Sequence, residues 1–461
     1  MSIIASFIVP HPPLIIPEIG KGEERRIQDT IDAYKSIAQE IALLKPETII
    51  ISSPHSQLYR DYFHISPGSF ALGNLSQFGA IDIKAEVEYD ESLISLISKE
   101  SIIQGIPARI EGERTSSLDH GTMVPLYFIN QFYNEYKMIR ISPSGLSPLK
   151  HYEFGKLIQS VIPKDKSVVW IASGDLSHKL KKDGPYGLVK EGPIFDKEIV
   201  EALSKGNFLK LLSFDPHFVR KAAECGLGSF TMMAGVLDGH NVKSDLLSYE
   251  GPFGVGYAVA KYDVLGKDET RMFDKIYMSN KEEETKLNRL NEDSYVRLAR
   301  KSLEHYIKHH KKLKTPDNLI SDLVNKQAGV FVSIHKNGNL RGCIGTIIPT
   351  TKCIADEIIQ NAVSSGVNDP RFSKVKKNEL PHLQYKVDVL FPPESIESFS
   401  ELDIKRYGVI VSSGYKSGLL LPNLEGIDTI EAQVNISKQK AGIRDGETFK
   451  MERFEVIRHS N

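Results

Sequence analysis

Four histidines in the first half of the chain occur in short motifs that could hold or serve a metal ion. They are His11 in VPHPP, His55 in SSPHS, His120 in LDHGTMVPL and His178 in SGDLSH. A neutral imidazole supplies one nitrogen ligand, and such ligands suit iron, copper, zinc or nickel. Any one of these histidines, taken alone, is more often a loop residue bonded to backbone. Their occurrence together indicates a shared metal site.

A metal held by histidines also needs a negatively charged ligand. Glu250, in LLSYEGPFGVGYAVA, lies just before a late strand pattern and is the best-placed carboxylate. Two histidines and one carboxylate form the facial triad of non-haem Fe(II) enzymes, which leaves coordination positions open for substrate and oxygen. Glu250 could equally be a surface residue near a turn, so the triad is a hypothesis.

The elements that would position these residues alternate between strand and helix patterns. Three short apolar segments end shortly before His11, His55 and His178, at residues 3–9, 48–52 and 167–172. Helix patterns and a late strand complete the series, at 23–44, 157–161, 194–204, 230–237 and 254–262. This alternation predicts an α/β domain whose mixed central sheet is flanked by helices. Ligands in open α/β sheets bind beyond the carboxyl ends of the strands, so three loops can meet over one point.

The character of the sequence changes after Tyr262. Residues 265–290 are strongly charged, with KEEE at 281–284, and nearly lack apolar periodicity. We interpret them as a linker between a first domain at 1–264 and a second at 291–461. A solvated helix that belongs to one of the domains is an equal alternative.

The second domain has the signals of an α+β fold with antiparallel strands. Asp293 or Ser294 can cap an amphipathic helix over 295–308. Asn337-Gly338 is a strong hairpin signal. Strand patterns lie on both sides of it and further along the chain, at 330–335, 340–347, 384–390 and 408–411.

The overall composition excludes several classes of protein. Lysine and arginine number 58 against 59 acidic residues, so no general electrostatic attraction to nucleic acid or acidic membranes is expected. Cys225, Cys343 and Cys353 are dispersed and form no C-x-x-C pair, which argues against a disulfide framework or a zinc knuckle and for a reducing compartment. No signal peptide and no apolar run of about 18 residues is present. We expect a cytoplasmic protein, with an isologous dimer as the default assembly.

The motifs VPHPPL, SPHS, LDHGTMVPL, SGDLSH and YEGPFGVGYAVA resemble, in the same order, those of class III extradiol ring-cleavage dioxygenases of the LigB type. They are also similar to the related Memo proteins. The resemblance covers about residues 1–263. It implies that His11, His55 and Glu250 hold Fe(II), with copper or zinc as alternatives.

The same resemblance implies roles for the other two histidines. His178 would act as acid/base, and His120 would line the pocket for substrate and oxygen. Asp119 and Asp175 could orient imidazoles as outer partners, although capping of a turn or helix start is the commoner role for each.

The second half resembles the AMMECR domain through NLRGCIGTI at 339–347, NDPRF at 368–372, YKVDVLFPPESI at 385–396 and GYKSGLLLPNL at 414–424. The fusion of the two domains resembles a component of the AmmeMemoRadiSam system, which implies a radical-SAM partner. Arg341 could bind an anion, and Cys343 could be a nucleophile if Arg341 stabilises its thiolate. The plainer interpretation makes Cys343 a small buried strand residue.

Three readings of the function follow. The first is an Fe(II) dioxygenase that cleaves a small catecholic or other aromatic ring with O2. The second is a Memo-like metal-binding or redox protein without ring cleavage that works with a radical-SAM partner. The third is a non-catalytic scaffold. Glu250 on the metal would favour the first reading, and a site that lacks it would favour the second.

Overall fold

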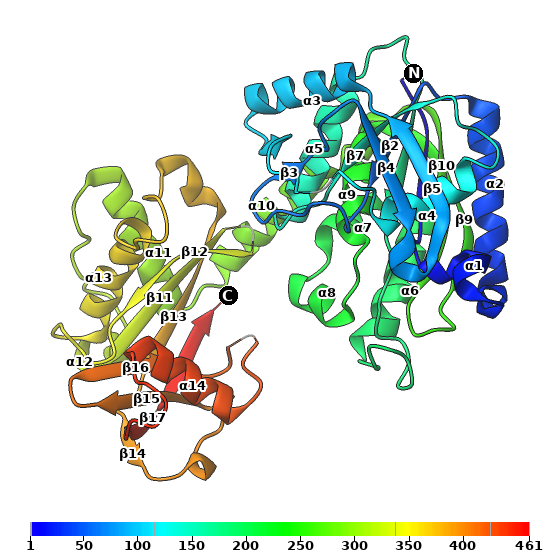
Figure 1. The fold of residues 1–461 in the computed structure, drawn as a ribbon. Coiled ribbons are helices and arrows are strands. Elements are labelled where there is room, and N and C mark those ends of the chain that lie inside the picture. The colour runs from blue at the N-terminus through cyan, green and yellow to red at the C-terminus, as the bar shows by residue number, and fades with distance from the viewer. Residues whose placement is uncertain (1, 115, 337, 425, 461) are drawn as a thin grey trace. The chain divides into compact units, whose positions relative to one another are not determined.

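The computed structural model describes residues 2–114, 116–336, 338–424 and 426–460. The chain forms two compact units, residues 1–278 and residues 279–461, and each has its own hydrophobic core (Figure 1). Asn337 of the expected hairpin lies outside the described residues.

The first unit is built around a six-stranded mixed sheet with the order β7-β2-β8-β1-β10-β9. The first four strands of that order are parallel, and β10 and β9 are antiparallel to their neighbours. The strands are β1 (Ile3–Val9), β2 (Thr48–Ser52), β7 (Lys137–Ile141), β8 (Val168–Ser173), β9 (His240–Glu250) and β10 (Tyr257–Lys267). Every residue of β2 and β8 is buried, as expected for parallel strands covered on both faces.

Helices supply that cover. α2 and α4 pack together on one side of the sheet, and α5 packs with α9 on the other (Figure 1). In α2 the buried residues recur at spacings of three and four, as on the inner face of an amphipathic helix. The helices are α1 (Pro17–Gly20), α2 (Gln28–Leu44), α3 (Glu91–Gln104), α4 (His120–Ile129), α5 (Pro148–Val161), α6 (Glu191–Ser204), α7 (Phe208–Ser213), α8 (Pro216–Ala222) and α9 (Leu227–Val236).

Two small sheets lie outside the central one. β3 (Phe63–His64) pairs with β6 (Ala108–Arg109), and β4 (Phe70–Leu75) pairs with β5 (Ala80–Glu88). Residues 110–119 connect β6 to α4 without a strand or helix among those described. This connection leads directly into His120, the first residue of α4.

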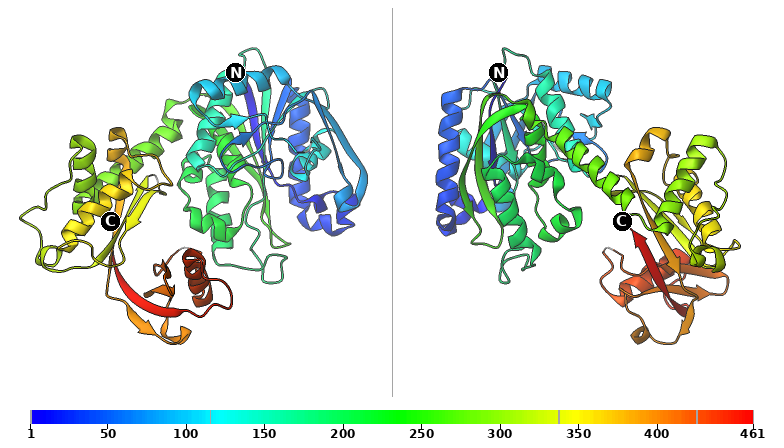
Figure 2. Two further views of the ribbon diagram at one scale, coloured as in Figure 1. Left: turned by 60° about the vertical axis from the view of Figure 1, so that its left-hand side comes forward. Right: turned by 180° about the vertical axis from the view of Figure 1, so that it is seen from behind.

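The second unit is a seven-stranded antiparallel sheet with helices against it. The order is β12-β11-β13-β17-β15-β16, and β14 also pairs with β17. One half of β17 pairs with β13 and the other with β15, so this long, bent strand joins the two parts of the sheet (Figure 2). The elements are β11 (Gly329–Lys336), β12 (Asn339–Gly345), β13 (Leu383–Leu390), β14 (Glu394–Ile396), β15 (Tyr407–Ser413), β16 (Lys416–Leu420), β17 (Lys450–Ser460), α11 (Ser294–His309), α12 (Ser321–Asn325), α13 (Ile354–Val367) and α14 (Ile430–Ala441).

The α/β and α+β fold classes expected from the sequence are confirmed. Asp293 caps α11 by accepting hydrogen bonds from the backbone N–H groups of Tyr295 and Val296. The charged stretch 265–290 contains the end of β10 and the helix α10 (Phe273–Leu290). Among the described residues, no helix is both long enough and apolar enough to cross a lipid bilayer.

Candidate metal centre

Three of the four predicted histidines lie side by side. β1 and β2 flank β8 in the sheet, and His11 and His55 follow β1 and β2. The ring centroids of His11 and His55 are 4.7 Å apart, those of His55 and His120 4.0 Å, and those of His11 and His120 5.4 Å. The structure therefore brings together residues from three separate segments of the chain.

The hydrogen bonds of His11 determine which ring nitrogen is free. Ser173 Oγ donates to the carbonyl of Gly121 at 2.6 Å and lies 2.9 Å from His11 Nδ1. Because the Ser173 hydroxyl hydrogen is already used in that bond, Ser173 Oγ accepts a hydrogen bond from the Nδ1–H group of His11. Nε2 is then the nitrogen with a free lone pair, and it faces His55 Nε2 at 3.0 Å. His11 is thereby oriented as a ligand.

Cys225 completes this group, and the sequence analysis had not considered it as a ligand. Its Sγ lies 3.5 Å from His11 Nε2, and the ligand atoms of His11, His55 and Cys225 all lie within 4.8 Å of one another. Cys225 precedes α9, whose first N–H, on Leu227, donates to the Glu224 carboxylate at 2.6 Å.

Two glycines allow this cysteine to approach the strand ends. A Cβ on Gly174, directly after β8, would lie 2.1 Å from the Cα of Gly226. Only residues without side chains fit such an approach of two backbones. The contact places Cys225 beside Asp175, whose carbonyl accepts hydrogen bonds from the backbone N–H groups of Cys225 and Gly226.

The separations of His11 Nε2 from the other two donor atoms fit a single ion. Zinc–nitrogen bonds of about 2.0–2.1 Å and zinc–sulfur bonds of about 2.3 Å at tetrahedral angles separate the donors by roughly 3.3 Å for N–N and 3.6 Å for N–S. The observed values of 3.0 Å and 3.5 Å are close to these. His11, His55 and Cys225 could therefore hold a metal ion together.

Burial determines the protonation of these groups. It lowers the pKa of His11 well below its usual value, and the neighbouring histidines lower it further. Desolvation and His55 lower the pKa of His120 to about 4. Burial raises the pKa of the Cys225 thiol well above its usual value, with Asp175 and Glu224 adding to the effect. Near neutral pH the imidazoles are uncharged and ready to coordinate, whereas the thiol must lose a proton to an incoming ion.

His178 and Asp175 also lie close to the same thiol. Ligand atoms of Asp175, His178 and Cys225 form a second group within 4.8 Å. Asp175 Oδ1 accepts the backbone N–H of His11 at 2.8 Å, and its Oδ2 is 4.0 Å from His11 Nε2. Burial raises the pKa of Asp175 to about 7, and it lowers the pKa of His178, as His55 also does. A neutral base and a carboxyl group thus adjoin the centre.

The structure does not bring Glu250 to the histidines. Glu250 ends the edge strand β9, and its Oε2 accepts hydrogen bonds from the N–H and Oγ1 of Thr30, at 2.7 Å and 2.6 Å. Thr30 lies in the first turn of α2, where backbone N–H groups lack helical partners and favour a negative charge. Neither ligand group found among the described residues includes Glu250. Its predicted role as metal carboxylate therefore has no support in the geometry, and the third candidate donor beside His11 and His55 is Cys225 Sγ.

Two cavities open on the centre. One, of about 390 Å³, is bounded by His55 and Cys225 and has apolar walls that include Leu58, Pro143 and Leu227. The other, of about 520 Å³, is bounded by His55 and His120 together with polar side chains, Gln57, Asn74, Ser76 and Gln77 among them. His55 borders both cavities.

In the second unit, the charged partners of Arg341 and Cys343 differ from those that the sequence led us to expect. Arg341 forms a bidentate ion pair with Glu379, through Nε at 3.1 Å and Nη2 at 3.0 Å. The cation beside Cys343 is instead Arg371, whose Nη2 donates to the Cys343 carbonyl at 3.2 Å. Burial raises the pKa of the Cys343 thiol, although Ser333 and Arg371 act in the opposite direction. These contacts favour the plainer interpretation of Cys343.

The fold agrees with the family comparisons. Residues 5–260 match the family described as the catalytic LigB subunit of aromatic ring-opening dioxygenase, and residues 296–459 match AMMECR1. The chain belongs to the LigB family, with an AMMECR1 domain fused behind the LigB domain.

Relatives share this architecture in whole or in part. Protein CA_C1420 of Clostridium acetobutylicum is 42% identical over all of this chain and 99% of its own length. A protein of Thermotoga maritima is 43% identical over 37% of this chain and 99% of its own length. A crystal structure of Pyrococcus horikoshii protein PH0010 is 33% identical and covers 36% of this chain and 88% of its own, with a TM-score of 0.33.

Replacement of Cys225 should distinguish it from Glu250 as a ligand. We expect Cys225→Ser and His55→Ala to lower the affinity for Fe(II) or Zn(II) on the order of a hundredfold, because each removes one donor. Glu250→Gln should bind as the parent does. Equilibrium dialysis with elemental analysis measures all four proteins. Loss of metal in Glu250→Gln with retention in Cys225→Ser would restore the facial triad.

Metal affinity should rise with pH. Above pH 7.5 the imidazoles are neutral and Asp175 is largely ionised, whereas the Cys225 thiol keeps its proton. Binding then releases one proton, so the apparent affinity for Zn(II) should increase about tenfold per pH unit between about pH 7.5 and 8.5. Competition with a chromophoric chelator gives the slope. A slope near zero in the parent would mean that Cys225 stays a thiol.

Thiol labelling tests Cys343. With Cys225→Ser and Cys353→Ser in place, Cys343 should react with a thiol reagent at neutral pH roughly several-fold more slowly than a free cysteine, because burial raises its pKa. The unfolded variant in denaturant gives the reference rate. A folded protein that reacts faster than this reference would reinstate Cys343 as an activated nucleophile.

Proposed function

We propose that the LigB domain holds one transition-metal ion through His11, His55 and Cys225 and uses it in redox chemistry on a small organic molecule. The observation that carries this proposal is the convergence on His11 Nε2, which lies 3.0 Å from His55 Nε2 and 3.5 Å from Cys225 Sγ, with all three ligand atoms within 4.8 Å of one another. It corresponds to the Memo-like reading of the sequence, in which the metal carboxylate of the dioxygenase triad is missing.

The donor set narrows the choice of metal. Imidazole and thiolate ligands suit copper, zinc or iron rather than magnesium or calcium, which prefer oxygen. Iron and copper can also change oxidation state, whereas zinc cannot. We therefore propose Fe(II) or copper as the working metal, with zinc as the redox-inactive alternative.

Ring opening of a small catecholic or other aromatic substrate with O2 is the second candidate. It is supported by the apolar cavity of about 390 Å³ beside His55 and Cys225, which can hold one aromatic ring, and by the activity named for the family. A bound ion would supply Lewis-acid and redox chemistry there.

The chain's own residues would supply the proton transfers of that reaction. His178, neutral because burial lowers its pKa, would accept a proton from a substrate hydroxyl. His120 would line the second cavity. The partners expected from the sequence, a radical-SAM protein and a second copy of the chain, remain predictions.

Metal analysis and a turnover assay test the two candidates together. Protein purified without oxygen should contain close to one iron or copper per chain, and His178→Ala should keep that metal because His11, His55 and Cys225 are untouched. If ring opening is the reaction, the parent should turn over a catechol and His178→Ala should lose most of the activity, on the order of a hundredfold.

Each outcome of the metal analysis and the turnover assay leads to a different conclusion. Metal without catechol turnover leaves the redox protein and removes the dioxygenase. Loss of metal in His178→Ala makes His178 a ligand and not a base. No metal in the parent, even after incubation with Fe(II) or Cu(I), would remove both candidates.

A further inference from the structure

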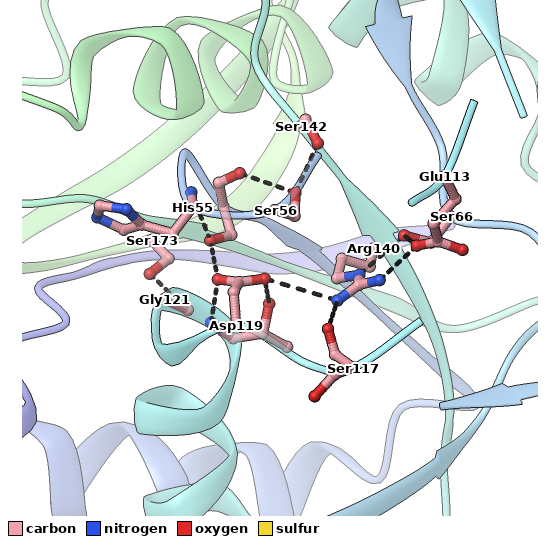
Figure 3. Close-up of polar contacts among 12 residues, drawn as sticks. His55, Ser56, Ser66, Glu113, Ser117, Asp119, Gly121, Arg140, Ser142 and Ser173 are labelled. Atoms are coloured by element: carbon pink, nitrogen blue, oxygen red, sulfur yellow. Dashed lines mark hydrogen bonds and ion pairs between the residues drawn. The ribbon is translucent and has the colours of Figure 1, made fainter. Parts of the chain in front are cut away.

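A buried arginine lies next to the loops that carry His55 and His120. Arg140, in β7, has only 2% of its side chain exposed. Its Nε donates to Ser66 Oγ at 2.8 Å, Nη1 to the carbonyl of Ser117 at 2.9 Å, and Nη2 to Glu113 Oε1 at 2.5 Å (Figure 3). Removing one partner of a buried ion pair is strongly destabilising, because the other charge remains buried without compensation. The cluster therefore strongly constrains the connection from β6 to α4.

Asp119 connects this cluster to the histidines. Its Oδ2 lies 3.7 Å from Arg140 Nη1, and its Oδ1 accepts the hydroxyl proton of Ser53 at 2.5 Å. Ser53 Oγ in turn accepts the backbone N–H of His55 at 3.3 Å. Figure 3 shows the Asp119 carboxylate between the arginine and the His55 loop. The chain of contacts from the guanidinium to the ligand is continuous.

The same carboxylate determines where α4 begins. Asp119 accepts the N–H of Thr122 at 3.1 Å and its hydroxyl at 3.0 Å, which makes Asp119 the N-cap of the helix. His120 is the first residue of that helix. A change in the orientation of Asp119 therefore moves His120 and the support of His55 together.

The residues that follow Arg140 hold the His55 loop directly. The backbone N–H of Ser53 donates to the carbonyl of Ile141 at 2.9 Å, and the hydroxyl groups of Ser56 and Ser142 are 2.5 Å apart. The His55 loop is thus attached to β7 partly through backbone, whereas the Arg140 side chain links β7 to the connection that leads to His120. The arginine is the part of this arrangement that a single substitution can remove.

We infer that Arg140 is a positioning residue, which fixes the separation of His55 and His120 through its ion pairs with Glu113 and Asp119. Without the guanidinium, two carboxylates in a buried region would repel each other, and the connection that carries Asp119 would move. The inference deepens the proposed function and rests on it for the effect on metal binding.

The first experiment needs no metal. Long-range ¹H–¹⁵N spectra of the metal-free full chain record the ring nitrogens of the histidines, assigned through single His→Gln variants. In Arg140→Met the signals of His55 and His120 should shift, whereas those of His240, on β9, should stay in place. Arg140→Lys, which keeps the charge but not the forked geometry, should return the signals part of the way.

Lys166→Met is the matched control. Lys166 pairs at 2.5 Å with Asp90, which is 2% exposed and also accepts the Thr48 hydroxyl at the start of β2, the end opposite His55. This variant leaves a buried carboxylate unpaired in the same domain. It should lower the melting temperature as Arg140→Met does and leave the signals of His55 and His120 unchanged.

The second experiment measures Co(II) binding and its visible spectrum. Arg140→Met should bind Co(II) about tenfold more weakly than the parent, the size of effect seen when an outer partner of a metal ligand is lost. Lys166→Met should bind as the parent does. If Arg140→Met does not fold, Ser53→Ala removes only the link between Asp119 and the His55 backbone, and it should shift the His55 signals and weaken Co(II) binding roughly threefold to tenfold.

Two results would overturn the inference. One is a folded Arg140→Met with parental histidine signals, and the other is an equal shift of those signals in Lys166→Met. A parent that binds no Co(II) would count against the proposed metal function, and the histidine spectra would still decide the role of Arg140.

Discussion

The candidate metal centre depends on three parallel strands that end side by side. β8 lies between β2 and β1, and the register pairs Ser52 with Ala172 and Val9 with Ser173. The segments that leave these strands therefore start at nearly the same level of the sheet. Buried parallel strands need helical crossovers on both faces, and these crossovers also supply α4, which begins with His120, and α9, which Cys225 precedes. The strand order determines where the site lies, and the side chains determine which groups face it.

This dependence explains which parts of the centre the sequence could predict. Apolar runs of five to seven residues are local signals, so the residue ranges of β1 and β2 agree with those expected. His11 and His55 follow those strand ends, which predicted that they lie close together, and the resemblance to LigB-type dioxygenases implied their roles as ligands. His120 begins the helix α4, and Asp119, for which a cap was the commoner expectation, is the N-cap of that helix.

The positions of Cys225 and Glu250 could not be predicted from local sequence signals. Glu250 belongs to a strand pattern, but β9 is an edge strand in the sheet, and its last residue faces α2 instead of the histidines. Cys225 reaches the centre from the start of α9, through the contact of Gly174 with Gly226. No local periodicity predicts which helix start packs against which strand end. The only signal in the sequence was an isolated cysteine next to a glycine before an apolar helix.

The hypothesis that Arg341 stabilises a Cys343 thiolate is not supported by the contacts, for a related reason. A strand argument places residues two apart on one face. The pairing of β11 with β12, however, shifts between Ile334 and His335, so that Arg341 is an extra residue opposite no partner. The bulge sends its side chain to Glu379, away from the thiol. Register irregularities of this kind depend on tertiary contacts.

The charges around the centre explain why a cysteine can replace the expected carboxylate. Two neutral imidazoles and one thiolate leave a divalent ion with one uncompensated positive charge in a largely buried place, which is unfavourable. The Asp175 carboxylate is near enough to compensate that positive charge, since its Oδ2 lies 4.0 Å from His11 Nε2. Burial raises its pKa to about 7 without an ion, and a nearby cation would favour the ionised form. The Cys225 thiolate and the Asp175 carboxylate together would neutralise a divalent ion. Two histidines and one carboxylate would leave the same ion with one positive charge. The proposed centre would therefore have the charge of a site with two anionic partners, one of which also holds the backbone of His11.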